Sequence, residues 1–227
     1  NPRSASGGEN APSFEQLKRL VVSARNSQSR IVTREDLLAH VYMMPSRFGR
    51  VFRAGVRSNP DNPLSTQLFI VSRGSSGILK PSSDALKDNL ALFLNQNRLI
   101  SDAIDILDSP VVNIGVKYSV VVNMTSNKNT VVQVINSKIK KYFGGLNFQI
   151  DQPIFLSEIQ NVIINSNGVV SLSEFEIINL TGVVSGLVYS SVSHDAEAAT
   201  FKGILSPPGG GIFEMRYPSD DIIGVAE

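Results

Sequence analysis

One ordered set of patterns between residues 105 and 177 constrains the fold more than any other part of the chain. A long β-type run, Val111 to Val122, predicts a strand. A polar turn follows, and apolar spacing then predicts a helix over Thr130–Phe143 and a second, shorter helix over Leu156–Ile164. A glycine turn leads into another strand-type run. The order presents no nucleophile, metal cluster or phosphate loop, and it is typical of a scaffold unit.

The residues before this run predict helices first and strands afterwards. Residues 1–13 are rich in Gly, Ser and Pro and predict a linker or a mobile end. An apolar stripe predicts a helix over Phe14–Ala24, and Thr33 is the expected N-cap of a helix that ends before Pro45. Two strands are predicted at Val51–Val56 and Gln67–Ser72. A helix over Ser83–Leu99 and a short strand at Ile104–Ile106 are predicted to follow.

Asp108-Ser109-Pro110 interrupts the pattern and predicts a boundary. The fold class expected is α+β, with two small α/β units of strand–helix–strand type followed by a β-rich C-terminal extension. The predicted divisions are a flexible linker (1–13), a first unit with N-terminal helices (14–108), a second unit (109–181) and the extension (182–227). Each unit should have its own apolar set, which we expect to be Leu86, Leu90, Phe93 and Leu94 in the first and Val120, Val122, Ile135 and Ile139 in the second.

Composition excludes several classes of function. The 227 residues are 42% hydrophobic and long enough to bury a core, whereas the net charge of +1 argues against strong attraction to nucleic acid or anionic membranes. The absence of cysteine excludes disulfides and thiolate chemistry. No apolar run approaches the length of a membrane span, and no signal peptide is visible. A start at Asn1 without Met suggests a fragment of a longer protein.

The two histidines are the first candidates for catalysis. His40 lies within the predicted Thr33 helix, and a structural role at the helix surface is favoured over a catalytic one. His194 is followed by Asp195 and lies near Ser191 and Ser193, but a triad is assembled by the fold and adjacency in sequence does not show one. A polar turn between strands is the preferred interpretation, and two histidines without matching carboxylates predict no metal site.

Two other groups have ordinary structural explanations. Arg73–Lys80 combines glycines, hydroxyls and cations, but its spacing is not that of a phosphate loop and Pro81 follows the lysine. Glu174 and Glu176 share one strand face, as an acid/base pair sometimes does. An exposed sheet face explains them equally well, with Phe175 and Ile177 facing the other side.

The densest basic cluster contains four arginines with two phenylalanines between them: Arg47, Arg50, Arg53 and Arg57, with Phe48 and Phe52. The functional hypothesis is a strip that binds nucleic acid through charge and aromatic stacking. On a strand, however, Phe52, Ala54 and Val56 would share one face while Arg53 and Arg57 share the other. A half-buried strand with a charged solvent side is therefore favoured, and pairing with an acidic partner is a third option.

Several segments in order resemble the baseplate J-like family of contractile-tail phages and related injection machines. They cover roughly residues 7 to 180: SGGEN, QSRIVTREDLLAHVYMMP, VFRAGV, PSSDALKDNLALFLNQNRLISDAIDILDSPVV, VNIGVKYSVVVN, the Lys138–Phe143 helix end and FLSEIQNVIINSNGVVSLSEFEI. The resemblance implies a structural baseplate wedge subunit, with no catalytic, cofactor-binding or metal residues. Its implied partners are copies of itself and other wedge proteins, in the virion tail and, during assembly, in the host cytoplasm.

Self-association is expected through the C-terminal strands and the Thr130–Phe143 helix, where Tyr142 and Phe143 are the expected anchors. No cofactor, membrane or nucleic acid is expected. Two alternatives stay open: a nucleic-acid-binding module that uses the Arg47–Arg57 strip, and a hydrolase that uses His194 and Asp195.

Overall fold

A computed structural model describes residues 18, 30–62, 64–99, 103–144 and 148–227 of the chain. Helices and strands are mixed, with a strand-rich C-terminal part, and the predicted α+β class is confirmed. The chain divides into two compact units, residues 1–109 and 110–227. The helix predicted over Phe14–Ala24 lies outside the described residues, apart from Lys18.

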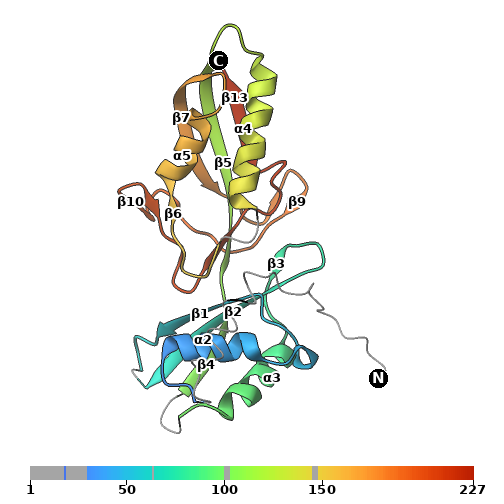
Figure 1. Cartoon of the computed structure of the whole chain (residues 1–227), viewed down its shortest axis with the longest axis vertical. Coiled ribbons are helices and arrows are strands. Elements are labelled where there is room, and N and C mark those ends of the chain that lie inside the picture. Colours follow the sequence, from blue (N-terminus) through green and yellow to red (C-terminus); the bar gives the residue numbers. More distant parts are fainter. Residues whose placement is uncertain (1–17, 19–29, 63, 100–102, 145–147) are drawn as a thin grey trace. The chain divides into compact units, whose positions relative to one another are not determined.

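The first unit is a small sheet with two helices on one face (Figure 1). Strand β2 lies at its centre, antiparallel to β1 and β3 and parallel to β4. Its elements are α2 (Arg34–Met43), the short 3-10 turn η1 (Ser46–Phe48), β1 (Arg53–Ser58), β2 (Ser65–Arg73), β3 (Leu79–Lys80), α3 (Asp84–Asn95) and β4 (Ala103–Asp108). The elements predicted from Thr33 onward in this half are all present, with shifts of a few residues at their ends.

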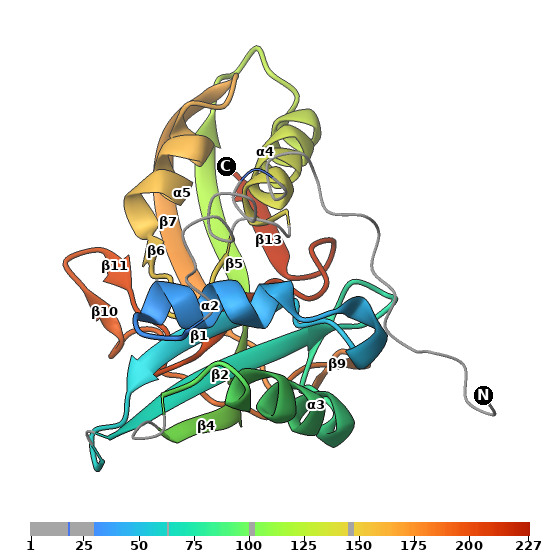
Figure 2. The same cartoon turned by 60° about the horizontal axis from the view of Figure 1, so that its bottom comes forward.

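Side-chain caps define where both helices begin. The Thr33 hydroxyl accepts a hydrogen bond from the Asp36 amide (3.1 Å), and the Asp36 carboxylate accepts one from the Thr33 amide (3.0 Å). Helix α3 begins at the Ser83 cap. Both helices press apolar side chains onto β1 and β2, and these pack as one core that contains Leu37, Val41, Ala54, Leu68, Ile70, Leu86, Leu90 and Leu94. Figure 2 shows the two helices of this unit from a second side.

The second unit is built around β5 (Val111–Val122), whose predicted bounds are confirmed. Strand β7 (Val169–Asn179) pairs antiparallel along one edge of β5, with Lys117 opposite Glu176. On the other edge β12 (Ile212–Glu214) and β13 (Ile222–Ala226) pair parallel to successive parts of β5. Residues 182–227 therefore supply two strands to the sheet of this unit.

Helices α4 (Lys128–Phe143) and α5 (Leu156–Ile164) cover one face of this sheet (Figure 1). Asn127 caps α4, and the predicted bounds of α5 are confirmed. The buried helix positions and the inward side of β5 form a core separate from that of the first unit. Its members include Val116, Val120, Val122, Val131, Ile135, Ile139, Ile159 and Ile163. The two apolar sets expected from the sequence thus lie in two different cores.

The C-terminal residues form short pairings as well. Strands β8 (Val183–Val184) and β9 (Leu187–Val188) make a hairpin, and β11 (Ile204–Leu205) joins β10 (Thr200–Phe201) to β6 (Ile154–Phe155). Strands β9 and β12 are short, with two and three residues. The hairpin turns through Ser185 and Gly186, which both have positive φ, as a two-residue turn between strands requires.

Candidate interaction surfaces

His40 lies in the core side of α2 and not at the helix surface, so that part of the prediction is wrong. Only 4% of the residue is exposed, and its Nδ1 lies 2.9 Å from the Asp36 carbonyl oxygen, one turn earlier. This contact joins one ring nitrogen of His40 to the backbone of its own helix. The structural role predicted for His40 is supported, in a buried setting.

His194 and Asp195 do not point toward a common centre. The His194 Nε2 lies 2.9 Å from the Ser206 carbonyl oxygen, while the Asp195 carboxylate accepts hydrogen bonds from the amides of Glu197 and Ala198, both 3.0 Å. Asp195 therefore closes a local turn, the usual use of an aspartate there. The observed geometry matches the polar turn that the sequence predicted.

The Arg73–Lys80 segment is a tight connection between β2 and β3. The Gly74 amide donates to the Ile78 carbonyl (2.8 Å), the Gly77 amide to the Gly74 carbonyl (2.9 Å), and the Arg73 Nε to the Gly77 carbonyl (2.8 Å). A phosphate loop would offer such amides and a guanidinium to its ligand. Here the two amides and the Arg73 guanidinium make hydrogen bonds to carbonyl groups of the loop itself.

The predicted basic strip is interrupted by burial. Arg53 is 8% exposed, its guanidinium carbon lies 4.2 Å from the centre of the Phe52 ring, and it donates to the Phe52 carbonyl. The Arg73 guanidinium lies 5.1 Å from the same ring. The expectation that Arg53 lies on a solvent-facing side is wrong, because the guanidinium packs on the aromatic ring. A continuous strip over Arg47–Arg57 is therefore not formed.

Glu174 and Glu176 lie on the exposed face of β7, while Phe175 and Ile177 pack on the core, as predicted. Lys117 is opposite Glu176 and Ser119 opposite Glu174 on β5. The two carboxylates thus belong to the outer, helix-free face of the sheet. Ile223 and Val225 of β13 lie on the same face and are 48% and 55% exposed.

The aromatic end of α4 is packed within its own unit. Phe143 is 8% exposed and its ring stacks on that of Phe148, at 5.5 Å between centroids. The Tyr142 hydroxyl donates to the Glu158 carboxylate (2.7 Å), and burial together with this bond raises the pKa of Tyr142. Phe143 cannot serve as an interface anchor, because its ring is part of the core.

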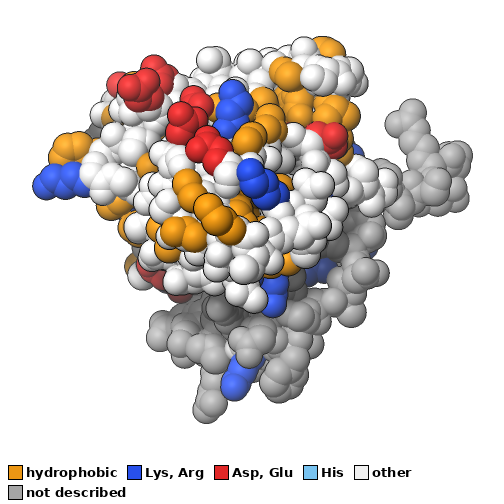
Figure 3. Space-filling view, turned by 90° about the horizontal axis from the view of Figure 1, so that it is seen from above, with side chains coloured by type: hydrophobic (Ala, Val, Ile, Leu, Met, Phe, Trp, Pro, Cys, Tyr) orange, Lys and Arg blue, Asp and Glu red, His pale blue; other side chains and the backbone are white. Residues whose placement is uncertain are grey.

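Exposed apolar side chains lie on two separate small sheets of the second unit, the β8–β9 hairpin and the β10–β11–β6 sheet. The exposed fractions in the β8–β9 hairpin are 71% for Val183, 39% for Val184 and 57% for Val188. Phe201 of β10 is 72% exposed and Phe155 of β6 is 42% exposed. Figure 3 shows one face of the molecule, on which apolar side chains form several patches with acidic and basic side chains among them.

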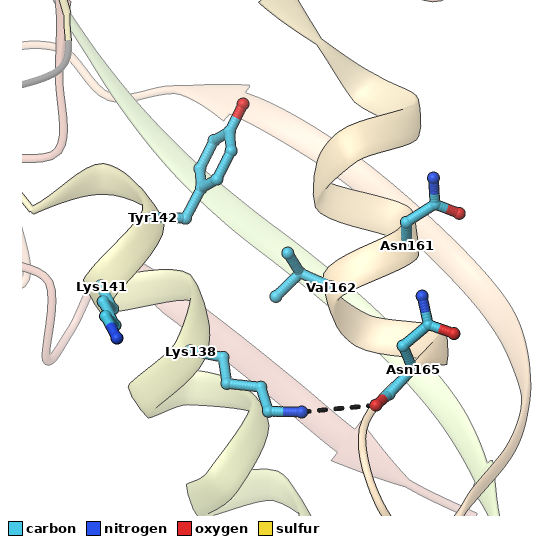
Figure 4. Close-up of a pocket in the computed structure, with 6 residues that line it drawn as sticks. All are labelled: Lys138, Lys141, Tyr142, Asn161, Val162 and Asn165. Atoms are coloured by element: carbon cyan, nitrogen blue, oxygen red, sulfur yellow. Dashed lines mark hydrogen bonds between the residues drawn. The ribbon is translucent and has the colours of Figure 1, made fainter.

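A groove lies between α4 and α5 (Figure 4). It is lined by Lys138, Lys141, Tyr142, Asn161, Val162 and Asn165. The Lys138 Nζ donates to the Ser166 hydroxyl (3.0 Å) and to the Asn165 carbonyl (3.4 Å). Since Tyr142 meets Glu158 near the start of α5 and Lys138 meets Asn165 at its end, the two helices are antiparallel.

A buried polar network that the sequence did not indicate holds the C-terminal strands. Asp221 is 2% exposed, and its carboxylate accepts hydrogen bonds from the Tyr189 hydroxyl and the Tyr217 amide, both 2.7 Å. Asn113, which is fully buried, donates to Glu214 (2.8 Å) and accepts from the Ser190 amide (2.6 Å). Apart from the local bond between the Tyr217 amide and Asp221, its bonds join residues 32 to 101 positions apart, so no local pattern could have revealed the network.

In the described part of the chain, no three His, Asp or Glu side chains are grouped to hold a metal ion. None of the helices formed by these residues combines the length and the apolar character that a membrane span needs.

No model of a protein family matches the sequence, and no curated protein matches it. Among solved structures, the chain is similar to one in the cryo-EM structure of the anti-feeding prophage baseplate, with 12% sequence identity and a TM-score of 0.49. The similarity covers 96% of this chain and 42% of that one, so this chain spans less than half of its length. An identity and a score this low assign no function, and the proposals below rest on the chain's own residues.

Proposed function

We propose that this chain is a structural subunit of a phage tail baseplate wedge, corresponding to the C-terminal half of the wedge protein of T-even-type contractile-tail phages. It acts by assembly and has no catalytic role. The ordered resemblance to the baseplate J-like family over residues 7 to 180 supports the class of assembly. Its place is the virion tail, and it associates with itself and with other wedge proteins around the central hub.

The observation that carries the proposal is the exposed apolar pair of the β8–β9 hairpin, with a second exposed apolar group on the β10–β11–β6 sheet. Val183 and Val188 are paired across the hairpin and are 71% and 57% exposed, and Phe201 on the other sheet is 72% exposed. Apolar side chains grouped on a surface mark sites where another protein binds, because their burial releases about 25 cal/mol per Å². The β8–β9 hairpin is also only a two-stranded sheet, which is marginal alone in water and gains stability from a covering surface.

Nothing in the described structure favours the alternative functions. A nucleic-acid strip would need Arg53 at the surface, where it could meet phosphates. A hydrolase would need the Asp195 carboxylate to orient His194, and that carboxylate is engaged with two backbone amides instead.

Sedimentation equilibrium of the purified chain from about 1 to 100 μM tests the proposal, because a stable self-contact of standard size gives a Kd within or below this range. We expect dimers or larger species in the wild type and a weaker association in a Val183→Ser, Val188→Ser variant. A Leu64→Ser variant is the matched control, since Leu64 is 67% exposed and belongs to the first unit. A wild type that stays monomeric throughout would contradict the proposal.

A further inference from the structure

The α4–α5 groove is basic at one side and apolar at its floor. Lys138 and Lys141 stand on α4, while Val162 of α5 points into the groove (Figure 4). Within the described residues neither lysine side chain pairs with a carboxylate: the Lys138 ammonium bonds neutral oxygens, and the Lys141 ammonium makes no hydrogen bond or ion pair. Glu158, the acidic residue of α5, accepts from Tyr142.

On the same side of α4 as the two lysines lies an exposed apolar residue, Val134. Val134, Lys138 and Lys141 are spaced by four and three residues, so they lie on one helix face. Val134 is 38% exposed. A complementary partner would therefore present two carboxylates followed by an apolar side chain along one face of a helix.

Among the described helices, α3 alone has such a face. Asp84, Asp88 and Leu92 are spaced by four residues, on the side opposite the buried Leu86, Leu90 and Leu94. Leu92 is 66% exposed and the Asp84 side chain 97% exposed. Lys87 neutralises this face only in part, because its ammonium is bound to Asp108 at 2.6 Å and makes a longer ion pair of 3.8 Å with Asp84.

The spacings match when α3 runs antiparallel to α4. Along α4 the stripe from Lys141 through Lys138 to Val134 spans about 10 Å, and along α3 the stripe from Asp84 through Asp88 to Leu92 spans about 12 Å, at ~1.5 Å per residue. This register places each aspartate beside a lysine and Leu92 beside Val134. The acidic start of α3 then faces the basic end of α4, as the helix dipoles favour.

We propose that the α4–α5 groove of one copy binds the Asp84–Leu92 face of α3 from a second copy. Groove against groove is disfavoured, since it would bring lysines against lysines. A contact between two different surfaces is head-to-tail, and such contacts build rings or filaments. The inference rests on the self-association proposed above and adds a second contact to the apolar one on the C-terminal strands.

Charge exchange in the full chain tests this contact by sedimentation equilibrium. Lys141→Glu and Asp84→Lys should each weaken head-to-tail association about tenfold or more, and the double variant should recover most of that loss. The Val183→Ser, Val188→Ser background isolates this contact from the apolar one. Lys128→Glu is the matched control: it makes the same charge change on the same helix, outside the stripe, and should leave association unchanged.

A second pair of variants tests the apolar end of the register. Leu92→Asn and Val134→Ser should also weaken association, while thermal melts show that each variant is folded. Folded single variants that associate like the wild type, or a double variant that recovers nothing, would overturn the contact and leave the proposed function standing. A wild type that is monomeric at every concentration would contradict both this contact and the proposed function.

Discussion

At the scale of single residues, the side chains with the most specific surroundings are buried polar groups of the second unit. Asn113 has four hydrogen-bond partners. Its backbone carbonyl accepts from the Leu180 amide and the Asn179 side chain. Its side-chain amide donates to the Glu214 carboxylate and accepts from the Ser190 backbone amide. Each bond joins β5 to a segment at least 66 residues later in the chain. A buried amide with all its partners present orders these segments, because leaving any of them unpaired costs free energy.

Asp221 should make stability depend on pH. Burial raises the pKa of this carboxyl, and the nearby Asp220 and Glu214 act in the same direction, against the hydrogen bonds from Tyr189 and Tyr217. The folded pKa of Asp221 therefore lies above the unfolded value of about 3.9. The stability that this carboxyl contributes is complete below pH ~3.9 and is lost as the pH rises through the folded pKa.

Denaturant unfolding of Asp221→Ala and wild type at pH 4 and pH 7 measures this effect. The loss of unfolding free energy caused by Asp221→Ala should be larger at pH 4 than at pH 7. Asp61→Ala, at an exposed loop position, is the control and should cost little at both. A loss that grows with pH would contradict the prediction.

At the scale of elements, the last turn of α4 separates a core residue from a surface residue. Phe143 belongs to the core and stacks on Phe148, whereas Tyr142 is half-buried and bonds Glu158. Phe143→Ala should lower the unfolding free energy of the second unit by about 3–5 kcal/mol, since it removes a buried ring and leaves a cavity. Tyr142→Phe removes one hydrogen bond and should cost about 1 kcal/mol or less. Urea melts of the two variants distinguish these costs, and equal costs would show that the assignment of Phe143 to the core is wrong.

At the scale of the whole molecule, the described residues form two cores with no shared member. Leu90 is fully buried in one and Ile135 in the other. We expect Leu90→Ala to destabilise the first unit and Ile135→Ala the second, each by about 2–5 kcal/mol. Hydrogen exchange resolved along the chain would detect this, with increased exchange confined mainly to the unit that carries the substitution. Equal loss of protection in both units for either variant would show that they unfold together. The functional separation of residues 182–227 as an extension stays a prediction.

The sequence by itself determined the regular elements that carry strong local signals. The β5 run, the α5 stripe and the Thr33 cap each depend on residues close together in the chain, so periodicity and capping chemistry were sufficient to predict them. Tertiary structure alone decided the burial of Arg53, the packing of Phe143 and the pairing of β13 with β5. Strand β13 carries little local signal, and Gly224 within it has no side chain because the Tyr118 ring occupies that space. The α4–α5 groove likewise exists only because folding brings two helices together, whereas the Asp84, Asp88 and Leu92 face of α3 follows from spacing within a single helix.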